Sequence, residues 1–393
     1  MNYRKFGADK LFDGFHFLEE AQVVVTDENG VMQGIIKKED AGENVLSLDG
    51  ILVPGLINAH CHVELSHMKD VIPPHTGLID FLISVVTKRG TADESFIRKK
   101  IAEAEDELYR NGIVAIADIV NTEHALETKQ QSKLRWYNLT EVLNIFDKTF
   151  PERWKHNQQI LSKHLQVGTG SVLTPHAPYT VSAATFQALN DATAGQVISI
   201  HNQETKAENE LFEKGTGDFL RLFSSVGFEA SPFEISGRSS LQTWLPYFTN
   251  GQTIILVHNT FIDEEDILFA KSHAEKYSLK IVYCLCPNAN LYIENALPPL
   301  NLLVDHECTI VLGTDSYSSN WQLSIAEEMR TLQKKFPHYS LETILQWASS
   351  NAAGAFGWKD LGTLKKGAQP GLVLLETNSE NQQILTGKAS RVI

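Results

Sequence analysis

The sequence predicts an α/β fold, a (β/α)8 TIM-type barrel with a small β-sandwich domain formed by both termini. Eight short apolar runs in the middle of the chain predict strands of a parallel sheet buried on both faces. Helical patterns lie between these runs, and this alternation is typical of parallel barrels. We expect residues 1–53 and 360–393 to form the small domain and residues 54–359 to form the barrel.

The two ends of the chain predict the small domain. AQVVVTDENGVMQGIIKK (21–38) places two β-branched runs around an Asn-Gly pair, a combination typical of a β-hairpin. GTLKKGAQPGLVLLE (362–376) has turn residues followed by an apolar run. We therefore expect both segments to supply strands to one small sheet domain.

The middle of the chain supplies the predicted barrel strands. The first run ends at His62, and the others cover residues 112–119, 134–143, 170–176, 196–201, 253–258, 280–286 and 308–315. Residues 94–112 and 324–336 show helical patterns between strands. The first of these ends at Gly112, a common helix terminator.

Seven polar side chains occur at or near the carboxyl ends of these runs. They are His62, Asp118, Glu141, His176, His201, His258 and Asp315. The carboxyl ends of barrel strands form the catalytic face, so we expect these side chains to meet there. Core packing alone would scatter polar residues along the strands.

The segment LINAHCHVELSH contains two histidines at strand spacing. Residues two apart on a strand face the same side, so His60 and His62 can bind one ion while Cys61 points away. An H-x-H pair alone is close to chance expectation, and surface or packed histidines are an equal alternative. The histidines and the aspartate at other strand ends favour the metal site, because imidazoles with a carboxylate suit Zn²⁺, Fe²⁺ or Mn²⁺.

Such a site can carry out hydrolysis, because a bound metal lowers the pKa of water toward about 7. Asp315 can accept a proton from this water, and His258 can hydrogen-bond to it. Glu204, three residues after His201, can carry a proton to the substrate.

Six segments resemble the amidohydrolase superfamily in its deaminase and chlorohydrolase branch. They are ILVPGLINAHCH, LTPHAPYTVS, HNQETKAENE, CPNANLYIENALPPL, LGTDSYSSN and ASSNAAGAFGW. The resemblance spans essentially the whole chain and implies a barrel, a small β-sandwich and one catalytic metal. Zn²⁺ is the favoured metal, with Fe²⁺ and Mn²⁺ as alternatives.

The resemblance also implies a role for individual residues. The metal ligands are His60, His62, His201 and Asp315. Glu204 is the proton shuttle, His258 positions the attacking water, and His176 contacts the substrate. For Glu64 we expect a substrate contact rather than a loop hydrogen bond. Two-metal barrels often carry a lysine at the end of the fourth strand, where this chain has His176, so we expect a single metal.

The pattern H-x-H-x-E-[LF]-S, followed by GLIDFL and an arginine, is similar to the aminodeoxyfutalosine deaminase subgroup. We expect hydrolytic deamination of an amino-substituted heteroaromatic ring, such as that of an adenosine-like nucleoside. Removal of halide from a triazine-like ring and opening of a cyclic amide are alternatives for the same site. A catalytically silent scaffold barrel is an alternative of another class, although it would have no need of six intact site residues.

Charge and composition exclude other functions. The net charge of −14 disfavours nucleic-acid binding, and no apolar run is long enough to span a bilayer. Four cysteines without a disulfide pattern favour a cytoplasmic protein. The resemblance suggests a homodimer that acts on a small molecule.

Two further groups of residues have weaker predictions. For Cys284 and Cys286 we expect buried packing rather than a metal site. Four aromatic side chains could stack on a planar ring, although packing is favoured for each of them: Phe81, Tyr179, Tyr317 and Trp321.

Overall fold

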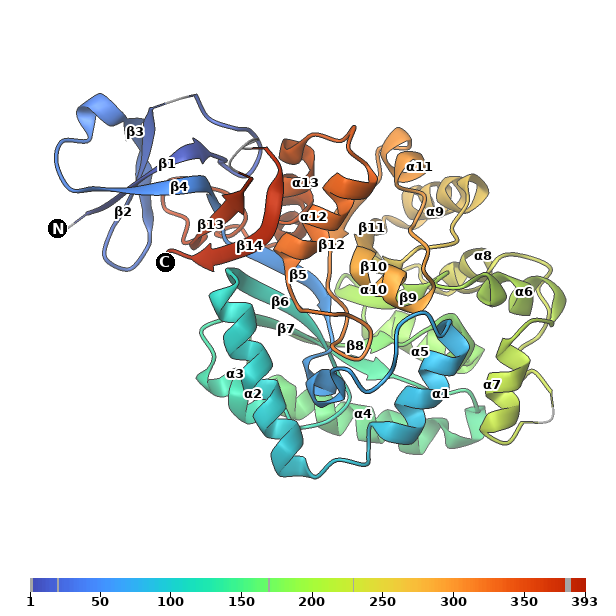
Figure 1. The fold of residues 1–393 in the computed structure, drawn as a ribbon. Helices are drawn as coiled ribbons and strands as arrows, with labels where there is room; N and C mark the ends of the chain where they lie inside the picture. Colours follow the sequence, from blue (N-terminus) through green and yellow to red (C-terminus); the bar gives the residue numbers. More distant parts are fainter. Residues whose placement is uncertain (1–2, 20, 169, 229, 379–382) are drawn as a thin grey trace.

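The computed structural model describes residues 3–19, 21–168, 170–228, 230–378 and 383–393. It has two parts (Figure 1): a barrel built from the middle of the chain, and a sheet that contains strands from both ends and lies to one side of the barrel. In the described residues, no helix is both long and apolar enough to cross a membrane.

The barrel consists of eight parallel strands in the described part of the chain. They are β5 (Leu56–Cys61), β6 (Ile113–Val120), β7 (Arg135–Val142), β8 (Gly170–Pro175), β9 (Val197–Asn202), β10 (Thr253–His258), β11 (Lys280–Leu285) and β12 (Thr309–Leu312). Backbone pairing links β5 to β8 in chain order and β9 to β12 in chain order. Each strand falls within about three residues of an apolar run, so the predicted strands are confirmed.

Hydrogen bonds at two seams join these strands into one barrel. Between β8 and β9, the Thr174 hydroxyl donates to the Ser199 carbonyl and accepts from the Ser199 N–H, with a distance of 2.7 Å in the second bond. Between β12 and β5, the backbone N–H groups of Thr314 and Asp315 both donate to the His60 carbonyl, at 3.0 and 3.1 Å. The second seam therefore joins two of the predicted site residues directly.

Thr174→Val tests the first seam. Valine has nearly the same shape but cannot bond to Ser199, so it leaves a buried N–H without a partner. We expect the free energy of unfolding to fall by about 1–3 kcal/mol in urea denaturation. Thr87→Val on the exposed face of a helix is the matched control and should change stability by less than about 0.5 kcal/mol. Equal stability of the two variants would contradict this account of the seam.

Both termini contribute to one six-stranded sheet. Its order is β14 (Leu385–Arg391), β13 (Leu372–Thr377), β4 (Val45–Pro54), β1 (Arg4–Leu11), β2 (Gln22–Thr26) and β3 (Met32–Lys37). β2 and β3 pair in antiparallel fashion, which confirms the predicted hairpin. The limits of the small domain stay a prediction.

Gly55 connects this sheet to the barrel, because it lies between β4 and β5. A Cβ atom at this position would lie 2.1 Å from Val114 and 2.5 Å from the Pro370 carbonyl, so only glycine fits. Its N–H faces the carbonyls of Pro370 and Gly371 at 3.1 and 3.2 Å. The sheet is thus fixed directly at the start of the first barrel strand.

Helices cover the outside of the barrel (Figure 1). The predicted helices at 94–112 and 324–336 are confirmed as α2 (Glu94–Arg110) and α12 (Ile325–Lys335). The Asp93 side chain caps α2 by accepting from the Phe96 N–H. α1 (Leu78–Lys88) lies next to α7 (Phe219–Ser225) (Figure 1). Residues of both helices line the cavity described below.

Candidate metal centre

His60 and His62 come from the end of the first barrel strand. The register between β5 and β6 shifts between Asn58 and Cys61, and such a bulge re-aims side chains beside a site. His60 has no exposed surface, and the Nε2 atoms of the two histidines lie 3.1 Å apart. The predicted pair therefore faces one side.

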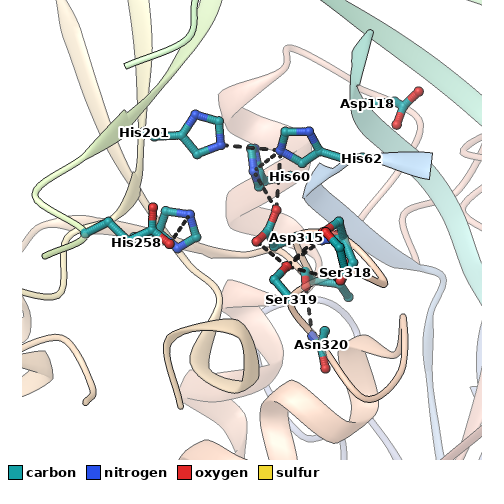
Figure 2. A network of polar contacts seen from close by, with 12 residues as sticks. His60, His62, Asp118, His201, His258, Asp315, Ser318, Ser319 and Asn320 are labelled. Carbon is teal, nitrogen blue, oxygen red and sulfur yellow. Dashed lines mark hydrogen bonds and ion pairs between the residues drawn. The ribbon is translucent and has the colours of Figure 1, made fainter. Parts of the chain in front are cut away.

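His201 from β9 and Asp315 from the end of β12 complete a compact group. His62 Nε2 lies 3.3 Å from His201 Nε2 and 3.3 Å from Asp315 Oδ1. The four ligand atoms of His60, His62, His201 and Asp315 all lie within 4.8 Å of one another. Figure 2 shows the three rings gathered beside the Asp315 carboxylate.

This donor set fits a divalent metal. With metal–ligand bonds of about 2.0–2.2 Å, neighbouring ligand atoms lie about 2.9–3.5 Å apart. Four of the separations within the group run from 3.1 Å to the 3.6 Å between His60 Nε2 and Asp315 Oδ1. Three imidazole nitrogens and one carboxylate oxygen are the ligands that zinc and related metals favour.

Neighbouring groups orient the donors. His201 Nδ1 lies 2.8 Å from the His176 carbonyl, which leaves Nε2 free for a metal. Burial lowers the pKa of His62 and of His201, so both rings are neutral. Burial alone would raise the pKa of Asp315, but hydrogen bonding to His60 holds it well below its usual range. The Ser319 hydroxyl donates to Asp315 Oδ2 at 2.5 Å.

Glu204 and His258 lie together in the same cavity. His258 Nε2 is 3.5 Å from Glu204 Oε1. Burial raises the pKa of Glu204 well above its usual range, and the charges of Asp315 and Glu208 raise it further. Burial lowers the pKa of His258 to about 4. A neutral carboxylic acid and a neutral imidazole are therefore available beside the metal group.

The backbone is strained at this end of the barrel. His258 and Asp315 adopt φ angles of 75° and 59°, and Gln203 has a φ of 47°. Residues other than glycine rarely occupy this region, and such strain concentrates at functional sites. Two of these three residues are predicted site residues, and the third precedes Glu204.

The two predicted substrate contacts have different surroundings. His176 Nδ1 lies 2.7 Å from the Thr180 hydroxyl, and the residue lines the cavity. Glu64 also lines the cavity, but its two carboxylate oxygens accept from the N–H groups of Asn121 and Thr122 at 3.0 Å. Burial raises the pKa of Glu64 to about 7. Glu64 thus makes hydrogen bonds to a loop, which was the alternative to the expected substrate contact.

A cavity of about 430 Å³ opens onto the metal group. Seven of the predicted site residues line it: His62, Glu64, His176, His201, Glu204, His258 and Asp315. An apolar wall of the cavity includes four side chains of α1 and one of α7: Leu78, Phe81, Leu82, Val85 and Leu222. This size and this lining are typical of a small-molecule site.

The other predicted residues have different surroundings. Phe81 and Tyr179 line the cavity. Tyr317 is buried with Lys69 over its ring, whereas Trp321 is exposed and lies against Tyr292. Cys284 and Cys286 are both buried, as expected.

Two functional features were not predicted from the sequence. Asp118 was expected at the catalytic face, but it lies before the last two residues of β6, and its carboxylate pairs with the buried Lys129. Nothing in the sequence indicates this partner, because a lysine in a polar segment normally lies on the surface. The apolar wall from α1 was also not predicted, although the GLIDFL segment at the start of this helix is part of the resemblance.

A (β/α)8 barrel whose strand ends gather three imidazoles and a carboxylate defines a metal-binding barrel of the hydrolase type. The chain belongs to the amidohydrolase family. The model of this family, Amidohydrolase family, matches residues 51–392. Together with the deaminase names of its relatives, this membership supports a hydrolase that acts on C–N bonds.

Known proteins similar to this chain include three deaminases. A 5-methylthioadenosine/S-adenosylhomocysteine deaminase of Saccharophagus degradans is 25% identical over 95% of this chain and 83% of its own length. An aminodeoxyfutalosine deaminase of Nitratiruptor sp. is 24% identical over 76% of this chain and 71% of its own. The crystal structure of Helicobacter pylori aminofutalosine deaminase in complex with methylthio-coformycin has a TM-score of 0.82 at 20% identity, covering 99% of this chain and 100% of the other.

Proposed function

We propose that the protein is a mononuclear metal-dependent deaminase that hydrolyses the exocyclic amino group of an adenosine-like nucleoside. The observation that carries this proposal is the four-ligand group of His60, His62, His201 and Asp315 beside the acid–base pair Glu204 and His258. Water adds to the amino-bearing ring carbon, the C–N bond breaks, and ammonia leaves. The family and the named relatives support this reaction.

The metal would be held by the four converging donors, and when bound it supplies Lewis acidity that lowers the pKa of water. Asp315 accepts the proton of the attacking water, because its carboxylate is held ionised. Glu204 donates a proton to the ring nitrogen, since its raised pKa keeps a proton on it at neutral pH. His258 is neutral and hydrogen-bonds to the attacking water.

The cavity supports a nucleoside with an apolar substituent. Its lining combines the residues of the metal group with aliphatic and aromatic side chains of α1 and with Leu222 of α7. A planar base fits at the metal end, and an apolar group on the sugar fits against the helices. The names of two relatives, a 5-methylthioadenosine/S-adenosylhomocysteine deaminase and an aminodeoxyfutalosine deaminase, are consistent with such a substrate.

A substrate panel tests the proposed reaction. Purified protein loaded with Zn²⁺ is incubated with adenosine, 5′-alkylthioadenosines, free purines, pterins, a chlorotriazine and cyclic amides. We expect ammonia from the adenosine derivatives, with 5′-alkylthio compounds favoured over adenosine. Chloride release or ring opening without ammonia would instead favour the chlorohydrolase or the cyclic-amide alternative. No turnover with any compound after metal loading would overturn the enzyme proposal.

Three finer statements stay proposals. Zinc is proposed over iron or manganese because imidazole nitrogens dominate the donor set. The homodimer and the cytoplasmic location remain the expectations drawn from the sequence. Light scattering of the purified protein tests the homodimer.

A further inference from the structure

A fully buried ion pair lies beside the metal group without belonging to it. Lys129, from α3 (Leu126–Gln131), places Nζ 2.5 Å from Asp118 Oδ2, and neither side chain has exposed surface. Figure 2 shows Asp118 on its own strand, apart from the cluster of rings around Asp315. Neither residue lines the cavity.

Lys129 makes two further contacts besides its ion pair with Asp118. Its Nζ donates to Asn138 Oδ1 at 2.8 Å and lies 4.9 Å from the centre of the Trp136 ring. Both contacts come from β7, the strand next to Asp118. A buried ion pair seldom stabilises a fold more than an apolar pair of the same size would. Its presence here therefore calls for a role other than stability.

The second oxygen of Asp118 indicates that role. Asp118 Oδ1 accepts from the Val63 N–H at 3.0 Å, and Val63 follows His62 directly. β5 ends at Cys61, which pairs with Asp118, and the chain turns at His62 into the short helix η2 (Val63–Met68). Asp118 thus supplies the acceptor for the first amide after the turn.

A second contact holds the same turn to the same strand end. Glu64 accepts from the N–H groups of Asn121 and Thr122, which directly follow β6. The two residues after His62 are therefore both fixed to the end of β6. His62 comes directly before Val63 and Glu64. The position of these two residues therefore determines where His62 Nε2 lies.

We propose that Asp118 and Lys129 form a positioning pair for His62. Asp118 fixes the Val63 amide and with it the turn that carries His62. Lys129 engages the other carboxylate oxygen, so that Oδ1 is directed at Val63. The proposal depends on the proposed function only in taking His62 as a metal ligand, and it does not depend on the substrate.

Two neutral double variants separate positioning from charge and packing. Asp118→Asn with Lys129→Met removes both charges but keeps a side-chain oxygen that can accept from Val63. Asp118→Leu with Lys129→Met removes both charges and also removes that oxygen. Asparagine and leucine have similar shapes, so the two variants differ chiefly in the acceptor for one N–H.

The readouts do not need a substrate. The dissociation constant for Zn²⁺ is measured by competition with a chromophoric chelator, and Co²⁺ absorption bands report the ligand geometry. Hydrogen exchange of the peptide containing Val63 is followed in the metal-free protein. We expect the Asn/Met variant to bind metal within about threefold of the unmodified chain, and the Leu/Met variant to bind it about 10–100-fold more weakly with altered Co²⁺ bands. Exchange at Val63 should be faster only in the Leu/Met variant.

Equal metal affinity in the two double variants would overturn the proposal, even if exchange at Val63 differs. If metal binding were weakened equally in both double variants, the effect would come from the lost charges and not from the lost acceptor. If the Leu/Met variant fails to fold, Asp118→Ala with Lys129→Met removes the same acceptor without adding bulk. A chain that binds metal as expected here but releases no ammonia would contradict the proposed function and leave this proposal intact.

Discussion

Glu204→Gln should abolish most turnover and leave the metal in place. The side chain keeps its shape but can no longer carry a proton to the ring nitrogen, a contribution worth about 10²–10⁴-fold in rate. Glu204 lies outside the four-ligand group, so the metal content should stay unchanged. The experiment measures ammonia release for kcat and elemental analysis for metal per chain.

Glu213→Gln is the matched control for this change. Glu213 lies in α6 (Lys206–Lys214), a few residues along the chain, but outside the cavity lining. Its substitution should affect neither rate nor metal content. Loss of the metal in Glu204→Gln would instead make Glu204 a ligand, and an unchanged kcat would remove it from the mechanism.

His201→Ala should lose both the metal and the reaction. It removes one of three converging imidazoles, and Lewis-acid stabilisation is worth several kcal/mol. We expect kcat/KM to fall by about 10³-fold or more and metal to be lost during dialysis. A ligand that binds only the folded state raises Tm, so added Zn²⁺ should raise the Tm of the unmodified chain much more than that of the variant.

His273→Ala serves as the control for a histidine outside the cavity. Its Nε2 lies 2.9 Å from the Phe248 carbonyl, on the outer helix α9 (Glu264–Tyr277). Metal binding should be unaffected by this substitution. If His201→Ala retained one tightly bound metal per chain, the proposed ligand set would be wrong.

The barrel could be predicted because its strands are buried on both faces. Such strands appear in sequence as continuous apolar runs, and β6 and β10 follow the runs 112–119 and 253–258 within about one residue. The metal group could be predicted for a related reason. His201 and Asp315 stand where apolar runs end, and in a barrel these ends meet.

Contacts that depend on the path of loops could not be predicted in this way. Glu64 follows the H-x-H pair, but its two hydrogen bonds go to backbone amides 57 and 58 residues away, which sequence spacing does not reveal. Lys129 is one of several charged or polar residues in its segment, and only the fold buries it against Asp118. The apolar wall needs α1 to lie against the cavity, and helical periodicity does not predict where in the fold a helix lies.

The central claim is that one bound metal at the four-ligand group drives deamination. The most direct measurement titrates metal-free protein with Zn²⁺ and follows the rate of ammonia release from a 5′-alkylthioadenosine. The account predicts no release without metal, a linear rise on addition, and a plateau at one equivalent per chain. Release at full rate without metal, a plateau at two equivalents, or no release at any metal concentration would contradict it.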